Sequence, residues 1–372
     1  MLILLLSFVI SFLLVAFMLP HILLLSLRKR LVDPIDRRKV HNLPASRLGG
    51  VTFYPSILFS AWFCISIAHL TQSISGSVVS IDIALIMESL SLLTLFLIGV
   101  YDDILGVAYK YKFSVQIFAA LLIVLSGSYF KTLHGLFGIE SIPAYFGMPL
   151  SILFYVFVTN AINLIDGIDG LASLLSIMAL FVYGVLLFHN GQLDNSIFAI
   201  ATLGALVPFC ALNVLGVKRE VKSKIFMGDT GSLVIGAIVG LMAIKVWNIS
   251  YVTDGMTPIT PNYYILAYTM LIVPCFDVIR IVIFRYRNKQ PLFLPDKNHI
   301  HHIFMGLGCC AQTALLCIMT INTLFVVLNL FLANKLNITS IIAIDIILWT
   351  LIHRYIKHLG IWKSREEESS KL

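Results

Sequence analysis

The chain has 372 residues, of which 59% are hydrophobic and only 12% charged, with a formal net charge of +7. Soluble domains carry about 25% charged residues, so this composition excludes a soluble enzyme and is typical of a polytopic membrane protein. The six cysteines show no C-x-x-C spacing, so neither a disulfide framework nor a zinc site is expected.

Eleven apolar stretches are candidate membrane spans, and they predict an all-α, polytopic helical bundle. In chain order they lie at 1–27, 49–70, 83–100, 113–130, 148–165, 169–189, 195–217, 232–248, 263–284, 312–332 and 338–357. The first stretch lacks a basic leader, which predicts a retained span rather than a cleaved signal peptide. We expect a single integral membrane domain at 1–360 and a short, disordered cytoplasmic tail at 361–372.

The distribution of basic residues predicts the orientation of the chain. Alternate connections and the C-terminal tail contain 22 Lys and Arg residues, whereas the connections on the opposite side contain 2. By the positive-inside rule, the N-terminus lies outside and the C-terminus on the cytoplasmic side of the plasma (inner) membrane. This asymmetry explains the net charge without nucleic acid as a partner. Lys245 and Arg280 lie near span ends, where their side chains are expected to extend toward the interface.

The stretch at 28–50 comprises the first cytoplasmic connection, at 28–48, which is strongly basic, and the paired glycines Gly49 and Gly50 that follow it. Such a run next to a span attracts the anionic head groups of membrane lipids. Arg47 adjoins the glycines, so it is the basic residue that we expect to reach an active site.

Adjacent carboxylates follow at the cytoplasmic end of the third stretch, where Asp102 and Asp103 precede Lys112. Neighbouring carboxylates repel each other, so they are best tolerated beside a metal ion or a cation such as Lys112. A solvated acidic helix end is the alternative for an isolated pair.

The stretch N-A-I-N-L-I-D-G-I-D-G-L at 160–171 places two amides and two carboxylates between two spans: Asn160, Asn163, Asp166 and Asp169. Polar groups are costly at membrane depth and usually mark a substrate or ion path. Gly167 and Gly170 predict a helix break near Asp166 that turns the acids inward to join the asparagines. We expect a ring of oxygen ligands suited to Mg²⁺, with packing between helices as the alternative.

The stretch K-I-F-M-G-D-T-G-S at 224–232 precedes the eighth span. Its glycines allow close backbone approach, and the N-terminus of the following helix offers free N–H groups to an anion. Asp229 could ligate a metal, and Phe226 could stack on a base. The alternative is an ordinary turn with a helix cap.

Three histidines and an acid lie in P-L-F-L-P-D-K-N-H-I-H-H-I-F-M at 291–305: Asp296, His299, His301 and His302. A zinc cluster is disfavoured because no cysteine is placed to complete it. The imidazoles are expected to donate hydrogen bonds to phosphates, and a solvated loop is the alternative.

Taken together, these stretches resemble the polyprenyl-phosphate N-acetylhexosamine-1-phosphate transferase family. Its members are integral membrane enzymes that move a sugar 1-phosphate from a UDP-sugar to a lipid phosphate. The resemblance covers about residues 28–305 and rests on Asp102-Asp103, on 160–171, on F-M-G-D-T-G-S at 226–232 and on H-I-H-H at 299–302. The last motif is similar to the N-acetylglucosamine branch. The muramoyl-pentapeptide branch of peptidoglycan synthesis carries three consecutive histidines, which Ile300 interrupts here.

The resemblance implies a role for each motif residue. Asn163 and Asp229 would hold Mg²⁺, with Mn²⁺ as an alternative ion. The implied catalytic residues are Asp102, Asp103, Asp166 and His299. The implied substrate-binding residues are Arg47, Lys112, Asn160, Asp169, Asn213, Phe226, Asp296, His301 and His302. Among these, Asp169 would recognise uracil and Phe226 would stack on it.

The implied reaction transfers an N-acetylhexosamine 1-phosphate, foremost GlcNAc 1-phosphate, from a UDP-sugar to undecaprenyl phosphate. It would release UMP at the cytoplasmic face and prime a cell-envelope polysaccharide. Direct attack by the lipid phosphate is favoured over a phospho-aspartate at Asp102, because a phosphate monoester with a second pKa near ~6 is already largely dianionic.

Several alternatives stay open at this point. The rivals are a muramoyl-pentapeptide transferase, a membrane prenyltransferase and a cation transporter, although a transporter should carry acids on both faces. The sugar, the polymer (lipopolysaccharide O-antigen, teichoic acid, capsule or common antigen) and the oligomeric state, a homodimer among the options, are undetermined.

Overall fold

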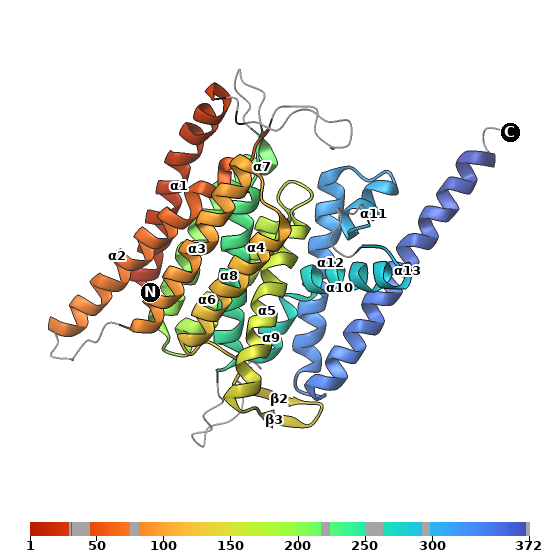
Figure 1. Ribbon diagram of the computed structural model, residues 1–372. Helices are drawn as coiled ribbons and strands as arrows, with labels where there is room; N and C mark the ends of the chain where they lie inside the picture. Colours follow the sequence, from red (N-terminus) through yellow and green to blue (C-terminus); the bar gives the residue numbers. More distant parts are fainter. Residues whose placement is uncertain are drawn as a thin grey trace. The chain divides into compact units, whose positions relative to one another are not determined.

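The computed structural model describes residues 1–29, 31, 45–74, 82–216, 224–249, 263–291 and 298–369. Nearly all of this backbone is helical (Figure 1). The chain divides into two compact units, of which the first comprises Met1–Lys131 with Ile142–Val252 and the second Thr132–Ser141 with Thr253–Leu372.

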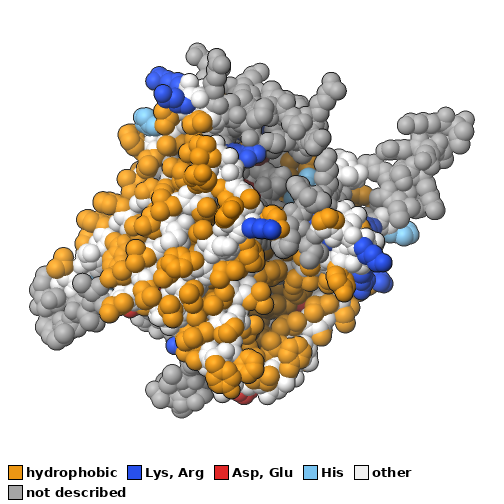
Figure 2. All heavy atoms as spheres, in the orientation of Figure 1, with side chains coloured by type: hydrophobic (Ala, Val, Ile, Leu, Met, Phe, Trp, Pro, Cys, Tyr) orange, Lys and Arg blue, Asp and Glu red, His pale blue; other side chains and the backbone are white. Residues whose placement is uncertain are grey.

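Nine helices in the described ranges are long and apolar enough to cross a membrane, and a bent helix pair would make ten. Apolar side chains cover much of the outward surface of the helices in Figure 2. The predicted all-α polytopic membrane protein is therefore confirmed. The count of eleven is not confirmed, since α4 (Tyr109–Leu125), which overlaps the stretch at 113–130, has only 17 residues. The predicted orientation of the termini stays a prediction.

The first unit is a bundle of long helices around α8. Its other helical elements are α1 (Leu2–Arg28), η1 (Leu48–Thr52), α2 (Phe53–Ile74), α3 (Ile83–Leu105), α4, α5 (Ala144–Ile165), α6 (Leu171–His189) and α7 (Leu193–Leu215). Helix α8 (Gly228–Trp247) is 94% buried over its apolar window, and α3, α5 and α6 pack against it. The sequence of α8 is apolar on all sides, which is the pattern of a helix at the centre of a bundle.

A buried ion pair links α3 to α8 inside the first unit. Lys245 Nζ lies 2.8 Å from Glu88 Oε1, and the two side chains are 12% and 3% exposed. The same carboxylate oxygen accepts a 2.7 Å hydrogen bond from the Ser128 hydroxyl. The prediction that Lys245 extends toward the interface was wrong, because an acid on the neighbouring helix satisfies its charge within the bundle.

Two short strands bring the start of the second helix next to the loop that precedes α8. β1 (Ala45–Ser46) pairs in parallel with β4 (Lys224–Ile225). The ladder continues as backbone hydrogen bonds from Gly49 N to Phe226 O (3.1 Å) and from Gly50 N to Met227 O (3.0 Å). A Cβ on Gly50 would lie 2.2 Å from Gly231 N, so the two backbones meet without room for a side chain.

The second unit combines a β-hairpin with five helices. Its elements are β2 (Thr132–Leu136), β3 (Ile139–Ser141), α9 (Tyr263–Thr269), α10 (Ile272–Arg287), α11 (Ile300–Gly306), α12 (Ala311–Leu332) and α13 (Ile338–Ser369). α9 and α10 meet at a 52° bend. Pro274 lies in the first turn of α10, where its missing N–H and its ring favour a break in the helix. The separate disordered tail at 361–372 stays a prediction, and the backbone of α13 continues to Ser369.

Replacing Gly50 by alanine should destabilise the protein, because the added methyl would meet the backbones of Gly231 and Met227 at 2.2–2.4 Å. Overpacking of this kind typically costs about 1–3 kcal/mol. We expect a lower thermal midpoint for the detergent-solubilised Gly50→Ala protein. Gly306→Ala is the control, because nothing lies within 4 Å of its added Cβ. Equal midpoints for both variants would contradict the close approach of the two backbones.

Candidate active site

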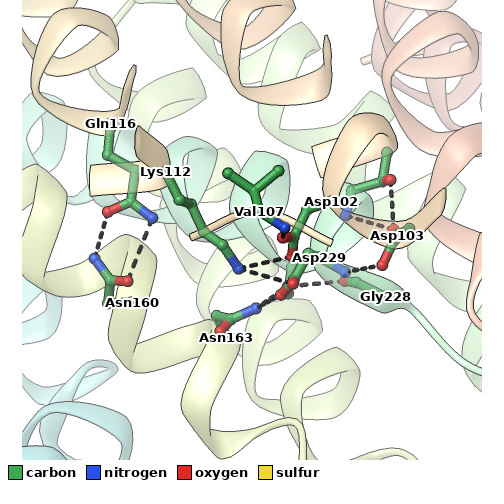
Figure 3. Close-up of polar contacts among 11 residues, drawn as sticks. Asp102, Asp103, Val107, Lys112, Gln116, Asn160, Asn163, Gly228 and Asp229 are labelled. Carbon is green, nitrogen blue, oxygen red and sulfur yellow. Dashed lines mark hydrogen bonds and ion pairs between the residues drawn. The ribbon is translucent and has the colours of Figure 1, made fainter. Parts of the chain in front are cut away.

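The Asp103 carboxylate caps the first turn of α8. It lies in the last turn of α3, and its Oδ1 accepts a 2.9 Å hydrogen bond from the backbone N–H of Asp229 (Figure 3). Its Oδ2 accepts from the N–H of Thr230 at 2.9 Å and from the Thr230 hydroxyl at 2.6 Å. A carboxylate at this position satisfies free N–H groups and the positive end of the helix dipole. This geometry gives Asp103 an anchoring contact, and its implied contact with substrate stays a prediction.

Gly228 permits this cap. Its φ of +67° lies in the left-handed region that favours glycine. A Cβ there would also lie 2.6 Å from Asp103 Oδ2 and 2.1 Å from the carbonyl oxygen of Arg47. The glycine of F-M-G-D is therefore required by the backbone turn and by the cap together.

Lys112 bridges two carboxylates beside the cap. Its Nζ lies 2.9 Å from Asp102 Oδ2 and 2.7 Å from Asp229 Oδ2 (Figure 3). The other oxygen of Asp102 accepts a 2.6 Å hydrogen bond from the N–H of Val107. The prediction that Lys112 offsets the repulsion between acids is confirmed, although Asp229 rather than Asp103 is the second acid that it contacts.

Asn163 completes this cluster from α5. Its Nδ2 donates to Asp229 Oδ1 and, at 2.7 Å, to the Ser232 hydroxyl. Asp229 and Asn163 therefore lie side by side, as their implied role as metal ligands requires. The Lys112 ammonium lies between the carboxylates of Asp102 and Asp229 and supplies the positive charge of the cluster. An oxygen-rich set of this kind fits a hard divalent ion that takes its remaining ligands from phosphate and water.

The predicted break in the stretch at 160–171 is confirmed. α5 ends at Ile165, and α6 begins after Gly170, whose φ is +85°. The predicted ring of four oxygen ligands does not form. In the described ranges no three His, Cys, Asp or Glu side chains group into a metal site. The prediction of this ring was wrong, because Asn160, Asn163 and Asp169 each bond to a different neighbour.

Asn160 pairs reciprocally with Gln116 of α4. Asn160 Nδ2 donates to Gln116 Oε1 at 2.6 Å, and Gln116 Nε2 donates back to Asn160 Oδ1 at 3.3 Å (Figure 3). Asp169 instead forms an ion pair with Lys224 of β4. Its Oδ1 is buried and has no hydrogen-bond partner within the described part of the chain. Asp169 thus keeps one acceptor oxygen available.

Asn213 ties the turn before α6 to the loop before α8. Its Oδ1 accepts a 2.6 Å hydrogen bond from Gly170 N, and its Nδ2 donates to Ile225 O at 2.8 Å. The side chain is only 4% exposed. Phe226, one residue further along, is half-buried, and Arg47 is exposed beside β1. Their implied contacts with the nucleotide stay predictions.

Asp166 lies in the turn between α5 and α6. Burial raises the pKa of its carboxyl to about 7, and the negative charges of Asp169 and Asp229 add to the increase. Asp166 therefore holds its proton over a pH range in which an exposed aspartate is ionised.

The predicted histidines belong to the second unit. His299 precedes α11, and His301 and His302 lie in its first turn. The His301 ring is 1% exposed, and burial lowers the pKa of this imidazole to about 3, helped by His302 and His299. His301 is thus a neutral, buried ring. The implied contacts of the three histidines with the donor stay predictions, and Asp296 lies outside the described residues.

The sequence analysis missed four polar residues that the structure places in these networks: Gln116, Lys224, Asp277 and Ser232. The sequence marks two of them as unusual, because they are polar residues within apolar stretches. Gln116 is a lone amide in an apolar run, and Asp277 is a carboxylate inside the stretch at 263–284. Polar groups at membrane depth mark functional sites, so both should have been candidates. Arg280 was predicted to extend toward the interface, but it pairs with Asp277 at 2.8 Å.

These features define a polytopic helical membrane protein with an acidic, lysine-bridged site on α3, α4, α5 and α8. Comparison with known proteins gives a match to glycosyl transferase family 4 over residues 84–247, which include Asp102, Asn163 and Asp229. This match confirms the resemblance drawn from the motifs.

The chain is also similar to individual transferases along most of its length. It is 27% identical over 321 residues to the probable undecaprenyl-phosphate N-acetylglucosaminyl 1-phosphate transferase of Bacillus subtilis (strain 168). This alignment covers 86% of this chain and 82% of the relative. It is 28% identical over 290 residues to the undecaprenyl-phosphate alpha-N-acetylglucosaminyl 1-phosphate transferase of Escherichia coli (strain K12), covering 76% and 71%. The protein of the same name from Salmonella typhi is 29% identical over 287 residues, again covering 76% and 71%.

The raised pKa of Asp166 predicts how stability depends on pH. The folded state keeps a proton that the unfolded chain releases between about pH 4 and about pH 7, so stability falls as the pH rises through this window. Without divalent cations, the thermal midpoint of the wild type should drop between about pH 5.5 and about pH 8. The drop should be smaller in Asp166→Asn, and an equal drop in both proteins would show that Asp166 is ionised throughout.

Proposed function

We propose that this protein transfers N-acetylglucosamine 1-phosphate from UDP-N-acetylglucosamine to undecaprenyl phosphate and releases UMP. The match to glycosyl transferase family 4 together with the cluster of Asp102, Lys112, Asn163 and Asp229 carries the proposal. The four side chains come from α3, α4, α5 and α8 and meet within hydrogen-bond distance. A cation between carboxylates, beside an amide, is the kind of arrangement that phosphoryl transfer uses to position and neutralise phosphates.

The surroundings of the site support a lipid acceptor. Large apolar side chains next to Asp102 and Asp103 are exposed on α3 and on the start of α4: Tyr101 (55%), Ile104 (48%), Leu105 (67%) and Tyr109 (54%). In a bilayer this face could contact a prenyl chain while the phosphate reaches Lys112. The excess of basic residues on one set of connections supports a site at the cytoplasmic face of the plasma membrane.

Asp229 and Asn163 would hold a magnesium ion, because their side chains adjoin through the Asn163 Nδ2–Asp229 Oδ1 contact and both residue types carry oxygens that ligate hard cations. When bound, the ion would neutralise charge on the phosphates of the donor. Lys112 would supply a second positive charge at the same place. Asp103 would keep Asp229 in position through its bonds to the first turn of α8.

The acceptor phosphate oxygen would attack the sugar-bearing phosphorus of the donor. A P–O bond forms to the lipid phosphate, the bond to the bridging oxygen breaks, and UMP leaves with that oxygen. Asp102 has one oxygen bonded to Val107 N and the other to Lys112, so both of its oxygens are engaged. This supports direct attack, with Asp102 orienting Lys112, over a phospho-aspartate at Asp102.

The pair formed by Asp169 and Lys224 suits recognition of the donor base. The buried Asp169 Oδ1 can accept from an N–H group, and Lys224 fixes the other carboxylate oxygen. A uracil ring presents such an N–H group. Asn213 would keep this pocket in shape by bonding the turn before α6 to β4.

The decisive assay incubates the purified protein with undecaprenyl phosphate, Mg²⁺ and a panel of UDP-sugars while UMP release is measured. UDP-N-acetylglucosamine should give UMP and the lipid diphosphate sugar. Product from the UDP-muramoyl-pentapeptide alone would move the protein to the peptidoglycan branch. Release of pyrophosphate from a prenyl diphosphate would instead identify a prenyltransferase.

Asp229→Asn should reduce UMP release by at least about 100-fold, because it removes a charge on which a metal ion and Lys112 both rely. The matched control is Asp194→Asn, an acid of the same unit that pairs with His69. The control should keep near-normal turnover. Near-normal Mg²⁺-dependent turnover of Asp229→Asn would remove Asp229 from the metal site.

The route of transfer can be tested in a single turnover with donor labelled at the sugar-bearing phosphorus and no acceptor. Direct attack predicts that no label remains on the denatured protein. A labelled adduct that disappears in Asp102→Asn would establish the two-step route instead.

A further inference from the structure

The His299 ring is held against α10 by a carboxylate that lies outside every motif identified in the sequence. His299 Nδ1 lies 2.8 Å from Asp277 Oδ2. Asp277 is 0% exposed and His299 is 6% exposed, so this contact is shielded from water. The parallel His301 ring covers His299 at a centroid distance of 5.8 Å and an angle of 5°.

Asp277 and Arg280, which both lie on α10, fix the backbone on both sides of His299. Asp277 Oδ1 accepts a 3.1 Å hydrogen bond from the N–H of Ile300. Arg280 donates to the carbonyl oxygen of Asn298 and, at 2.8 Å, to Asp277 Oδ1. Three successive residues are therefore tied to one turn of α10, and the ring has little freedom to rotate.

The bonding around Asp277 decides which ring nitrogen of His299 carries the proton. Arg280 and the Ile300 N–H both donate to Asp277, which stabilises the carboxylate in its ionised form. An ionised carboxylate can only accept, so His299 must donate from Nδ1–H. The hydrogen bond of one ring nitrogen sets the state of the other. Nε2, on the far side of the ring, is thereby presented away from α10.

We propose that Asp277 is a positioning residue for His299, which keeps the proton on Nδ1 and leaves Nε2 as a hydrogen-bond acceptor for a substrate group rather than as the donor to phosphate that the sequence suggested. Arg280 supports this role by neutralising Asp277 and by holding Asn298. The consequence for catalysis rests on the proposed function and on the implied contact of His299 with the donor. The tautomer and the orientation of the ring follow from the contacts in the second unit alone.

Asp277→Asn would reverse this arrangement while leaving the shape of the side chain nearly unchanged. Arg280 donates to Oδ1, and the Ile300 N–H lies 3.1 Å from Oδ1 and 3.3 Å from Oδ2, so the amide oxygen of the variant should take the Oδ1 side. The amide NH₂ would then face His299 Nδ1 and require it to accept. The proton of the neutral ring would move to Nε2.

The first test is nitrogen NMR of the full-length protein with ¹⁵N-labelled histidine, in which the His299 signals are assigned by their loss in His299→Gln. The wild type should show Nδ1–H, and Asp277→Asn should show the reversed tautomer. Asp345→Asn is the matched control, because Asp345 is a fully buried acid of the same unit that pairs with Asn329 instead. An Nε2–H tautomer in the wild type would overturn the proposal even if Asp277→Asn did not fold.

The second test is a double-mutant cycle on UMP release. Asp277→Asn should lower kcat/KM by about 10- to 100-fold in the wild type, as loss of a hydrogen bond to a charged group does. In a His299→Gln background the same change should cost less than about threefold, because the residue on which it acts is gone. Equal losses in both backgrounds would show that Asp277 only supports the fold. If no UDP-sugar gives UMP with the wild type, the proposed function fails, whereas the NMR result still decides the tautomer.

Discussion

The hydrogen bonds from the first turn of α8 to Asp103 are the contact on which the rest of the site depends. Free N–H groups at a helix end cannot be left unpaired in a bilayer, where water is scarce. Asp103 satisfies two of them and thereby fixes Asp229, the next residue after Gly228. Lys112 and Asn163 then assemble around Asp229 from α4 and α5. This cap and the contacts around Asp229 thus join four helices, α3, α4, α5 and α8.

Charged side chains elsewhere in the chain are also paired with polar partners inside each helical unit. Several acids in the candidate spans pair with a basic side chain on the same or a neighbouring helix, as in Glu88–Lys245 and Asp277–Arg280. Asp345 differs, since its described partner is the amide of Asn329 at 2.8 Å. Breaking one member of such a pair leaves an uncompensated charge in a medium of low dielectric constant, which is strongly destabilising. These pairs therefore fix which helices can be neighbours.

Each unit uses a carboxylate to orient a neighbouring residue, although the functional side chains of the two units differ. In the first unit Asp103 orients Asp229 through backbone N–H groups. In the second, Asp277 orients His299 through the imidazole itself and through the N–H of Ile300. Each orienting acid lies on a membrane helix, and each oriented residue lies at or next to the start of another helix. Rigid helices can hold polar groups within the tolerance that phosphoryl transfer requires, whereas a free loop cannot.

The sequence alone determined the class of the protein, the location of most of its helices and the family that its motifs resemble. Long apolar runs in a bilayer must be helical, and Gly167 and Gly170 correctly marked the break after α5. The sequence did not predict which side chains are partners. The stretch at 160–171 was expected to form one ring of ligands, yet Asn160 meets Gln116 and Asp169 meets Lys224. Only the tertiary structure could decide these pairs, because they join residues on different helices whose rotation and depth depend on packing, which local spacing does not encode.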